Sequence, residues 1–391
     1  MNNREKSHLI IGIDIGSNST RVCAVNHFSN RSTTPEIVDL VEIPTEGIYK
    51  GNITDEKGLA NTVSKAITAL KIDIVKKRPH IMLSLNAAGI NSASNNTSIV
   101  GSNISSEITR LDIERLDREA QISVANIKNK KVIHSIPIRY KLDHQEIQGL
   151  PIGMFGKRLE GKFLFVFAPV LYIEKIENIF SSINLPIEDT VVGPFAELIP
   201  LLNKKQRIAG TALINIGHST TSILVYENDN PILTSILGIG SNDITNDIAL
   251  GLQISLEDAD KIKLGKSDIP YSKRKLEEII DARIEFICEK INLEFDKINR
   301  RGLLPGGIVL TGNGSKLGKI EFLLKEYLKL PIRFADNEIK EFSEGQLSDS
   351  SYARVYGITF LAPSVSPDYT INKFFKKLGK NVSDFLKKLL P

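Results

Sequence analysis

The start of the chain alternates short apolar runs with amphipathic stretches of helical spacing. Residues 8–16 predict a buried strand that ends in a turn, and residues 20–28 predict the strand that returns beside it. Apolar positions recur at helical spacing over 58–73, and 80–88 predict a further strand. This pattern is typical of a mixed α/β fold.

The middle of the chain has a different texture. Residues 86–161 begin rich in Ser and Asn, become helical at 112–127 and turn strand-like at 131–142. The apolar strand pattern then resumes at 162–170, and a helix is predicted at 171–183. We therefore expect this segment to be a separate subdomain.

The second half repeats the opening pattern. Residues 214–226, INIGHSTTSILVY, echo residues 13–25, IDIGSNSTRVCAV, at an offset of 201 positions. A polar patch at 203–210 precedes the echo and is a candidate domain boundary, and 306–328 predict strand, Gly-rich turn and helix. A long amphipathic helix is predicted at 273–299, with one apolar side formed by Leu276, Ile280, Ile284, Ile287, Ile291, Phe295 and Ile298.

Composition narrows the class of protein. A chain of 391 residues allows two or three domains, and a net charge of +4 is too mild for a nucleic-acid binder. Cys23 and Cys288 are far apart in apolar surroundings, which predicts reduced core thiols in a cytoplasmic protein. The first apolar run is cut by Asp14, which argues against a signal peptide, and no run is long enough to span a membrane.

The two echoes are candidate phosphate-binding hairpins. Small residues let backbone N–H groups approach an anion, although one such hairpin is equally well an ordinary turn. Two copies facing each other can hold a phosphate chain from both sides, with Asp14 placed to hold Mg²⁺ through water. The predicted phosphate-binding residues are Asp14, Gly16, Ser17, Asn18 and Ser19 in the first copy and Asn215, Gly217, His218, Ser219 and Thr220 in the second.

A third turn is a candidate binding site for a base or ribose. Residues 307–317, GIVLTGNGSKL, end a predicted strand in Gly312, Asn313 and Gly314, where a base or ribose could rest against bare backbone. The order hairpin, hairpin, Gly-rich turn resembles the phosphate 1, phosphate 2 and adenosine motifs of the actin-like ATPase superfamily.

Further segments resemble one family of that superfamily, FtsA. In residues 238–265 a turn at Gly240 leads into an ITNDIA run and a helix, and the resemblance implies that Asp260 and Lys263 contact the nucleotide. These two are i, i+3 neighbours on one helix face, so the alternative is a surface ion pair. Residues 134–166 are similar to the FtsA subdomain called 1C, and 350–362 to the helix that closes the core.

The resemblance covers nearly the whole chain and implies an α/β, actin-like fold of two duplicated RNase H-like domains around a nucleotide cleft. The implied units are 1–85 and 162–209 for domain 1 (1A), 86–161 for the FtsA-type 1C subdomain, 210–241 and 305–362 for domain 2 (2A), 242–304 for subdomain 2B, 363–370 for a linker and 371–391 for a C-terminal amphipathic helix.

Three positions depart from the family pattern. The family normally has acidic residues where this chain has Asn215 and Ser222, so attraction of a metal and polarisation of water should weaken. Members that hydrolyse ATP usually place Glu or Gln just before a proline, whereas Gly193 stands there, in a segment (187–195) otherwise predicted as a strand. Glu197 is a candidate substitute, and His218 is expected to be a neutral donor. We therefore expect nucleotide binding with at most weak hydrolysis.

The last segment, 371–391, separates into two faces when plotted as a helix. The apolar face comprises Phe374, Phe375, Leu378, Val382, Phe385, Leu386, Leu389 and Leu390, and the polar face comprises Lys373, Lys376, Lys377, Lys380, Lys387 and Lys388 with Asp384. A helix docked on the core is one interpretation. A lysine face after a Pro-containing linker favours an interfacial helix on anionic lipid, and FtsA has a membrane-targeting helix at this place.

The resemblance implies an ATP-binding division protein that polymerises and tethers FtsZ filaments of the septal ring to the cytoplasmic face of the bacterial membrane. Its implied partners are itself, the FtsZ tail, anionic lipid and other division proteins. Arg283 and Lys290 are candidates for an acidic tail, or equally solvated charges. The alternatives are a pilus-assembly scaffold like PilM, or a phosphotransfer or phosphohydrolase enzyme of the superfamily, since residues 14–19, DIGSNS, resemble exopolyphosphatases.

Overall fold

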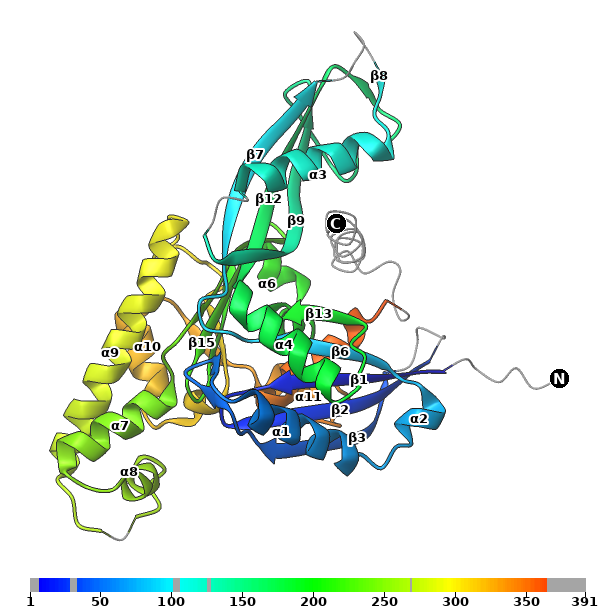
Figure 1. The fold of residues 1–391 in the computed structure, drawn as a ribbon. Coiled ribbons are helices and arrows are strands. Elements are labelled where there is room, and N and C mark those ends of the chain that lie inside the picture. The colour runs from blue at the N-terminus through cyan, green and yellow to red at the C-terminus, as the bar shows by residue number, and fades with distance from the viewer. Residues whose placement is uncertain (1–6, 29–33, 101–105, 125–127, 268, 364–391) are drawn as a thin grey trace.

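The computed structural model describes residues 7–28, 34–100, 106–124, 128–267 and 269–363. Two sheets dominate it (Figure 1). The five-stranded sheet has the order β13 (Asp189–Val192), β6 (His80–Leu85), β1 (Ser7–Ile15), β2 (Ser19–Phe28) and β3 (Glu36–Pro44). The nine-stranded sheet has the order β10 (Gln145–Ile147), β9 (Lys130–Leu142), β12 (Arg158–Pro169), β7 (Asn91–Val100), β16 (Asn230–Leu237), β15 (Thr221–Glu227), β14 (Thr211–Ile216), β17 (Ile308–Thr311) and β18 (Ile332–Phe334). Two small ladders pair β4 (Ile48–Tyr49) with β5 (Asn52–Ile53) and β8 (Ser106–Glu107) with β11 (Phe155–Gly156).

The repeat seen in the sequence is a repeat in the fold. β1 pairs antiparallel with β2 and parallel with β6, while β14 pairs antiparallel with β15 and parallel with β17. Across the first hairpin Asp14 lies opposite Arg21, and across the second Asn215 lies opposite Ser222. The offset of 201 positions therefore holds for both strands of each hairpin.

The helices are α1 (Glu56–Ala69), α2 (Ile74–Lys77), α3 (Arg110–Val124), α4 (Val170–Ser182), α5 (Gly193–Leu201), α6 (Lys204–Ala209), α7 (Ser241–Leu252), α8 (Leu256–Lys263), α9 (Lys273–Lys297), α10 (Ile320–Leu328), α11 (Asp336–Phe342) and α12 (Ala353–Gly357). Single 3₁₀ turns occupy Asn313–Lys316, Ser350–Tyr352 and Ile358–Leu361. Among the described helices, none is long and apolar enough to cross a bilayer.

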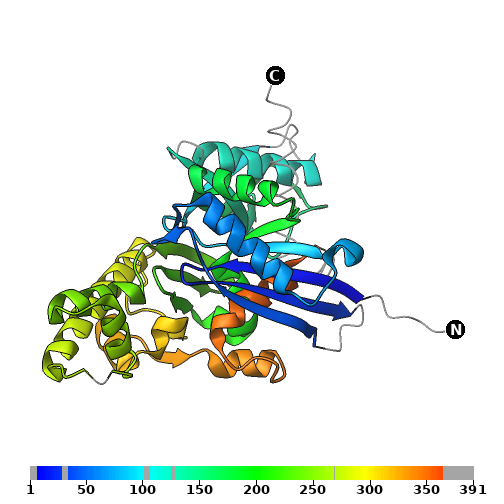
Figure 2. The same ribbon diagram turned by 60° about the horizontal axis from the view of Figure 1, so that its bottom comes forward.

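Two of these helices join the halves. α5 contacts β13 and β6 of the first sheet and β14 and β15 of the second, and α12 packs on α5, β1 and β2. The helices α7 to α10 gather at one end of the molecule, and β7, β9, β12 and α3 extend at another (Figure 1). Figure 2 shows α1 and α4 side by side on the near face of the first half, where they contact each other.

Local sequence explains several element starts and buried faces. Asp55, Asn203 and Ser272 are N-caps whose side chains accept backbone N–H groups in α1, α6 and α9. Along α9 the predicted apolar side is confirmed, because Ile284, Ile287, Ile291 and Phe295 are buried and Leu276, Ile280 and Ile298 pack partly buried against the same core. Cys23 and Cys288 are buried and unbridged, in agreement with two core thiols.

One local prediction differs from the structure, and two stretches form elements that the sequence analysis did not predict. The strand expected over 187–195 ends at Val192, because the Gly193–Pro194 pair begins α5. The polar patch at 203–210 forms the short helix α6. The Ser/Asn-rich stretch contains β7, a strand that pairs with β12 along its whole length and meets β16 at Ser235. β7 carries almost no apolar signal of its own, so its neighbour β12 supplies its register.

The predicted unit boundaries stay predictions. β12 runs without a break across the boundary drawn between residues 161 and 162. The predicted helix 371–391, and the linker from residue 364 onward, lie outside the described residues.

Candidate functional site

The two hairpin turns have the same backbone geometry. The N–H of Gly16 donates to the carbonyl of Ser19 at 3.0 Å, and the N–H of Gly217 donates to the carbonyl of Thr220 at 2.8 Å. A Cβ at Gly16 would lie 2.7 Å from the Ser19 oxygen, and one at Gly217 would lie 3.0 Å from the Thr220 oxygen. Each turn is therefore closed so tightly that a side chain at its glycine would be crowded.

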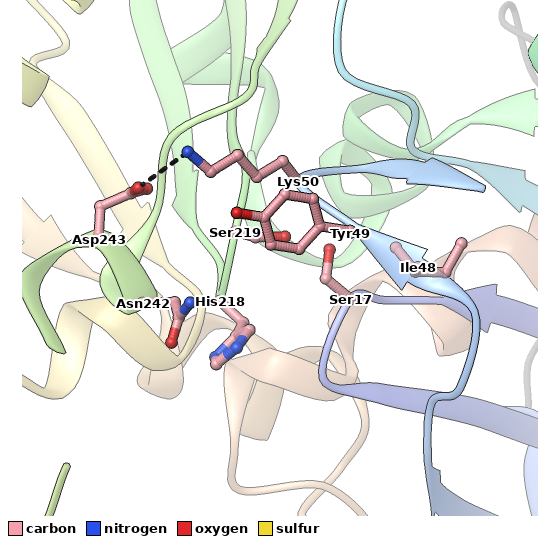
Figure 3. Close-up of a pocket in the computed structure, with 8 residues that line it drawn as sticks. All are labelled: Ser17, Ile48, Tyr49, Lys50, His218, Ser219, Asn242 and Asp243. Carbon is pink, nitrogen blue, oxygen red and sulfur yellow. Dashed lines mark ion pairs between the residues drawn. The ribbon is translucent and has the colours of Figure 1, made fainter. Parts of the chain in front are cut away.

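A pocket opens between these turns (Figure 3). Its lining comes from both halves: Ser17, Ile48, Tyr49 and Lys50 from the first, and His218, Ser219, Asn242 and Asp243 from the second. The Lys50 side chain reaches across to Asp243, with Nζ 3.7 Å from Oδ1 (Figure 3). The Ser219 hydroxyl is buried and has no hydrogen-bond partner among the described residues. A donor of this kind at a pocket wall suits a phosphate oxygen.

Helix α7 begins directly on the second turn. The N–H groups of Ser241 and Asn242 donate to the carbonyls of Gly217 and His218, at 2.9 and 2.7 Å. A Cβ at Gly240 would lie 2.6 Å from the His218 carbonyl oxygen, so Gly240 permits this close approach. The turn is thus fixed by the helix that follows it.

The third predicted turn lies against the end of β14. Gly312 has a φ of +87°, and a Cβ there would lie 2.4 Å from Oδ1 of Asn215. A Cβ at Gly314 would lie 2.8 Å from the carbonyl of Ile216, and Asn313 begins the 3₁₀ turn between the two glycines. The predicted adenosine turn and second phosphate turn are therefore neighbours.

The predicted acid and lysine of α8 face the second turn. Lys263 Nζ lies 2.7 Å from Oδ1 of Asp260 and donates to the Thr245 hydroxyl at 2.6 Å, and its side chain is buried. Burial lowers the pKa of His218, and the charge of Lys263 lowers it further. His218 is therefore neutral at physiological pH, and its role as a hydrogen-bond donor stays a prediction.

At the ends of β1 and β14 that lead into the two turns, Asp14 and Asn215 belong to a set of five polar residues that we call the floor network: Asp14, Asn86, Glu197, Asn215 and Arg354. The Asn86 amide donates to Oδ1 of Asp14 at 2.7 Å, and Nη1 of Arg354 lies 3.8 Å from the same oxygen. Nη2 of Arg354 lies 3.0 Å from Oε1 of Glu197, and the Asn215 amide donates to that oxygen. The network runs from β1 through α12 and α5 to β14, so it links the two halves.

The charges of the floor network are almost out of water. Glu197 is 1% exposed and Asp14 is 4% exposed. Burial raises the pKa of Glu197, against the lowering effects of Arg354 and Asn215. Burial alone would lower the pKa of Arg354, but the carboxylates of Glu197 and Asp14 outweigh it and raise that pKa. Arg354 is therefore a permanent cation held between two carboxylates.

Gly193 has no room for a larger residue. A Cβ there would lie 2.0 Å from Oδ1 of Asn86 and 2.8 Å from Nε of Arg354. Asn86 and Arg354 thus fill the space beside the position predicted to lack a water-orienting side chain. Glu197, the predicted substitute, is held by Asn215 and Arg354.

The residues around Asp14 do not fit a resident Mg²⁺. Mg²⁺ keeps several waters in an octahedral shell, whereas Asp14 is buried, accepts from Asn86 and has a guanidinium 3.8 Å away. In the described part of the chain, no group of three or more His, Cys, Asp or Glu side chains is arranged to hold a metal ion.

Sequence reasoning missed Lys50, Asn86 and Arg354. Lys50 and Asn86 carry no motif. Arg354 had a signal, because it is the one charged residue between Asp349 and Asp368, within the apolar run that forms α12. A lone charge inside a core-forming segment indicates a buried partner.

Known proteins match both the sequence and the fold. The family described as cell division protein FtsA matches residues 212–357, and the SHS2 domain inserted in FtsA matches residues 88–167. The cell division protein FtsA of Pseudomonas aeruginosa is 26% identical over 351 residues, covering 84% of this chain and 83% of the relative. That of Bacillus subtilis is 26% identical over 357 residues, covering 86% and 79%.

The chain belongs to the FtsA family. Its fold resembles a chain of the PilM–PilN type IV pilus biogenesis complex, with a TM-score of 0.65 and 17% identity over 92% of this chain and 99% of that one. A glycerol dehydratase reactivase matches with a TM-score of 0.50 and 9% identity, covering 92% and 100%. This FtsA-family protein therefore has the predicted actin-like fold, and these two likenesses concern the fold alone.

Two further predicted residues lie on α9 of this FtsA-family protein. Arg283 is bound by both oxygens of Asp247, at 2.5 and 2.8 Å, and its guanidinium lies 5.3 Å from the ring centre of Phe286. Lys290 Nζ lies 4.8 Å from the same ring, which is 37% exposed. Arg283 and Lys290 therefore flank one exposed aromatic side chain.

Proposed function

We propose that this protein is an ATP-binding, actin-like cell division protein that polymerises and tethers FtsZ filaments of the septal ring to the cytoplasmic face of the bacterial membrane. The observation that carries the nucleotide part is the pair of glycine-containing turns, closed by equivalent hydrogen bonds, that face one pocket. Its role in division rests on the family to which the chain belongs.

The bound ATP lies with its phosphates between the two turns. Ser17 and Ser219 approach them from opposite halves, and Lys50 supplies a positive charge at the pocket wall. The ribose and base rest against Gly312, Asn313 and Gly314, with Lys263 and Asp260 nearby on α8. The Mg²⁺ predicted at Asp14 is not part of this proposal, because the surrounding residues do not fit it.

Hydrolysis is weak in this proposal. A phosphotransfer or phosphohydrolase enzyme needs a group that orients the attacking nucleophile. Gly193 cannot accept such a side chain, and Glu197 is fixed by Arg354 and Asn215. Nucleotide then acts by holding the two halves together rather than as a consumed substrate.

The membrane part of the proposal rests on the sequence of 371–391. The residues expected to enter or touch the lipid are Phe374, Phe375, Lys376, Lys377, Leu378, Phe385, Leu386, Lys387, Lys388 and Leu389. Each lysine near an anionic surface contributes about 1 kcal/mol, so binding should weaken with salt.

For the FtsZ tail, the exposed ring of Phe286 with its two flanking cations is the binding surface that we propose. An aromatic side chain beside Arg283 and Lys290 suits a peptide that combines acidic and apolar residues. Self-contacts within a filament and contacts with other division proteins complete the proposed partners.

The test is co-sedimentation with vesicles containing anionic lipid, comparing the full chain with one that ends at Thr370. The full chain alone should pellet, and raising the salt should release it. If both chains pellet alike, the tether is somewhere other than 371–391. If neither pellets, a scaffold of the pilus-assembly kind becomes the better proposal, because the lysine-rich segment then has no lipid partner.

A further inference from the structure

One charged side chain in the cleft has no counterpart in the repeat. Arg354 enters from α12 and lies among residues of both hairpins and of α5, with only 11% of its side chain exposed. Its Nη1 faces Asp14 of β1, and its Nη2 faces Glu197 of α5 and the Ser222 hydroxyl of β15, at 3.0 and 3.3 Å. A guanidinium therefore occupies the point where the two halves meet.

Of the two hairpins, only the first places an acidic side chain near Arg354. Position 215, which corresponds to Asp14, is an asparagine that donates to Glu197 instead of adding a charge. Position 222 lies opposite Asn215 and is a serine whose oxygen can accept a hydrogen bond from Arg354. The floor network thus holds two carboxylates, Asp14 and Glu197, and both face the same guanidinium.

The space around Arg354 is also adapted to it. A side chain at Gly193 would collide with Asn86, and its Cβ would lie 2.8 Å from Nε of Arg354. A divalent cation brought to Asp14 would meet a fixed positive charge at short distance in buried surroundings, where repulsion is weakly screened. The floor network therefore has room for one cation, and that cation is the Arg354 guanidinium.

We propose that Arg354 is the built-in cation of this cleft, so that nucleotide binding does not require a divalent metal. The inference deepens the proposed nucleotide function and rests on it. Arg354 offsets one of the two negative charges of the floor network, and ATP is held by the two turns and Lys50 without a metal bridge to the protein. The same charge arrangement leaves no acid free to activate water through a metal.

The experiment is calorimetric titration of the full chain with ATP, once with excess MgCl₂ and once with EDTA. We expect the two affinities to agree within about threefold, since the Arg354 guanidinium already lies beside Asp14, where a divalent cation would otherwise bind. Binding in MgCl₂ with no binding in EDTA overturns the inference and leaves the proposed nucleotide function intact. Failure to bind in either buffer overturns both.

A double variant makes the role of Arg354 specific. Arg354→Met with Glu197→Gln removes both charges of the 3.0 Å pair together, so that Asp14 is the one buried charge of the network that loses a partner, and it keeps the Asn86 amide. Asp14 then has no guanidinium nearby, and ATP should bind about tenfold or more tightly in MgCl₂ than in EDTA. Equal affinities in the two buffers for this variant would show that Arg354 is not the reason for metal independence.

The matched control is Arg207→Met, which breaks a 2.7 Å pair with Asp229 far from the pocket. It should bind ATP like the parent chain in both buffers. Thermal unfolding of each variant shows that the folded protein is being compared.

Discussion

The two hairpins of this protein share a backbone and differ in their chemistry. Gly16 and Gly217 close their turns through equivalent N–H to carbonyl hydrogen bonds. Below the turns, the first hairpin places a carboxylate at Asp14, whereas the second places an amide at Asn215. The turn geometry is thus duplicated, whereas of the two equivalent positions only Asp14 carries a charge.

This difference bears on what the cleft can do. Backbone N–H groups that point into a concave turn can bind an anion, but activation of water requires placed acids or bases. In the second half the amide of Asn215 is turned to Glu197, and Glu197 is turned to Arg354. Through the hydrogen bond of Asn215 to Glu197, the second half is connected to the first, so the floor network is suited to hold the two halves together.

Placing an acid at position 215, as at the equivalent position 14, should give the largest loss of stability. Asn215→Asp replaces a donor to Glu197 by a second carboxylate in a buried position, so unfolding in urea at pH 7 should show a loss of about 2–4 kcal/mol. Lowering the pH should recover part of the loss, because one carboxyl then becomes protonated.

The reciprocal change, Asp14→Asn, is the control. Its oxygen can still accept from the Asn86 amide, and Arg354 keeps Glu197, so about 1 kcal/mol or less should be lost. Equal losses for the two variants would contradict the asymmetry of the floor.

The close packing where the two halves meet can be tested at Gly193. Gly193→Ala adds a Cβ 2.0 Å from Oδ1 of Asn86, which must move, so the free energy of unfolding should fall by about 1–3 kcal/mol. Gly318→Ala is the matched control, because nothing lies within 4 Å of its added Cβ and its φ is not positive. A change in stability equally small for both variants would mean that Asn86 and Arg354 adjust freely.

The sequence predicted the fold because its signals were local or repeated. Strands β1 and β14 are apolar runs followed by small-residue turns, and the apolar side of α9 recurs at helical spacing. The offset of 201 positions relates the two hairpins through their residues alone. By contrast, β7 was missed, since its pairing with β12 rather than its own residues makes it a strand.

The site was predictable only in part, for a related reason. The turn residues follow from composition, but the floor network is assembled by contacts between positions far apart in sequence. Arg354 meets Asp14 across 340 positions, the difference of their numbers, and Asn86 meets Asp14 across 72. No pattern along the chain encodes such pairs, although a lone arginine in an apolar helix was a visible sign.

Lowering the pH should weaken the hydrogen bond at the N-terminal end of α5, the helix that carries Gly193 and Glu197. His134 Nε2 accepts the N–H of Val192, the N-cap of α5, and burial lowers the pKa of His134 from 6.5 to about 3. The unfolded chain therefore binds a proton below pH 6.5 that the folded chain excludes. Stability contributed by His134 is full above pH 6.5 and falls as the pH drops towards 3.

Between pH 7.5 and pH 5.5 this loss should be about 1.4 kcal/mol in urea unfolding. His134→Gln keeps an acceptor and removes the titration, so its stability should depend less on pH by that amount. Other groups, such as Asp189 with a pKa raised by burial to about 6, titrate in both proteins and cancel in the difference. Identical pH profiles would mean that His134 is protonated without cost.

The smallest effect on stability is expected where the halves meet at the pocket mouth. The Lys50 side chain is 45% exposed and lies 3.7 Å from Asp243, so Lys50→Met should change the free energy of unfolding by less than about 1 kcal/mol.

The effect of Lys50→Met on the affinity for ATP should be larger, because a lysine at the pocket wall attracts phosphates from the first half while the turn of the second half receives them. Calorimetric titration should show a several-fold loss of affinity at low salt that shrinks as salt is added. Lys65→Met, which removes an exposed lysine 4.0 Å from Glu46, should leave the affinity unchanged at both salt levels. If Lys50→Met also left it unchanged, the phosphates would be held by the two turns alone, and the asymmetry between the halves would be confined to the floor network.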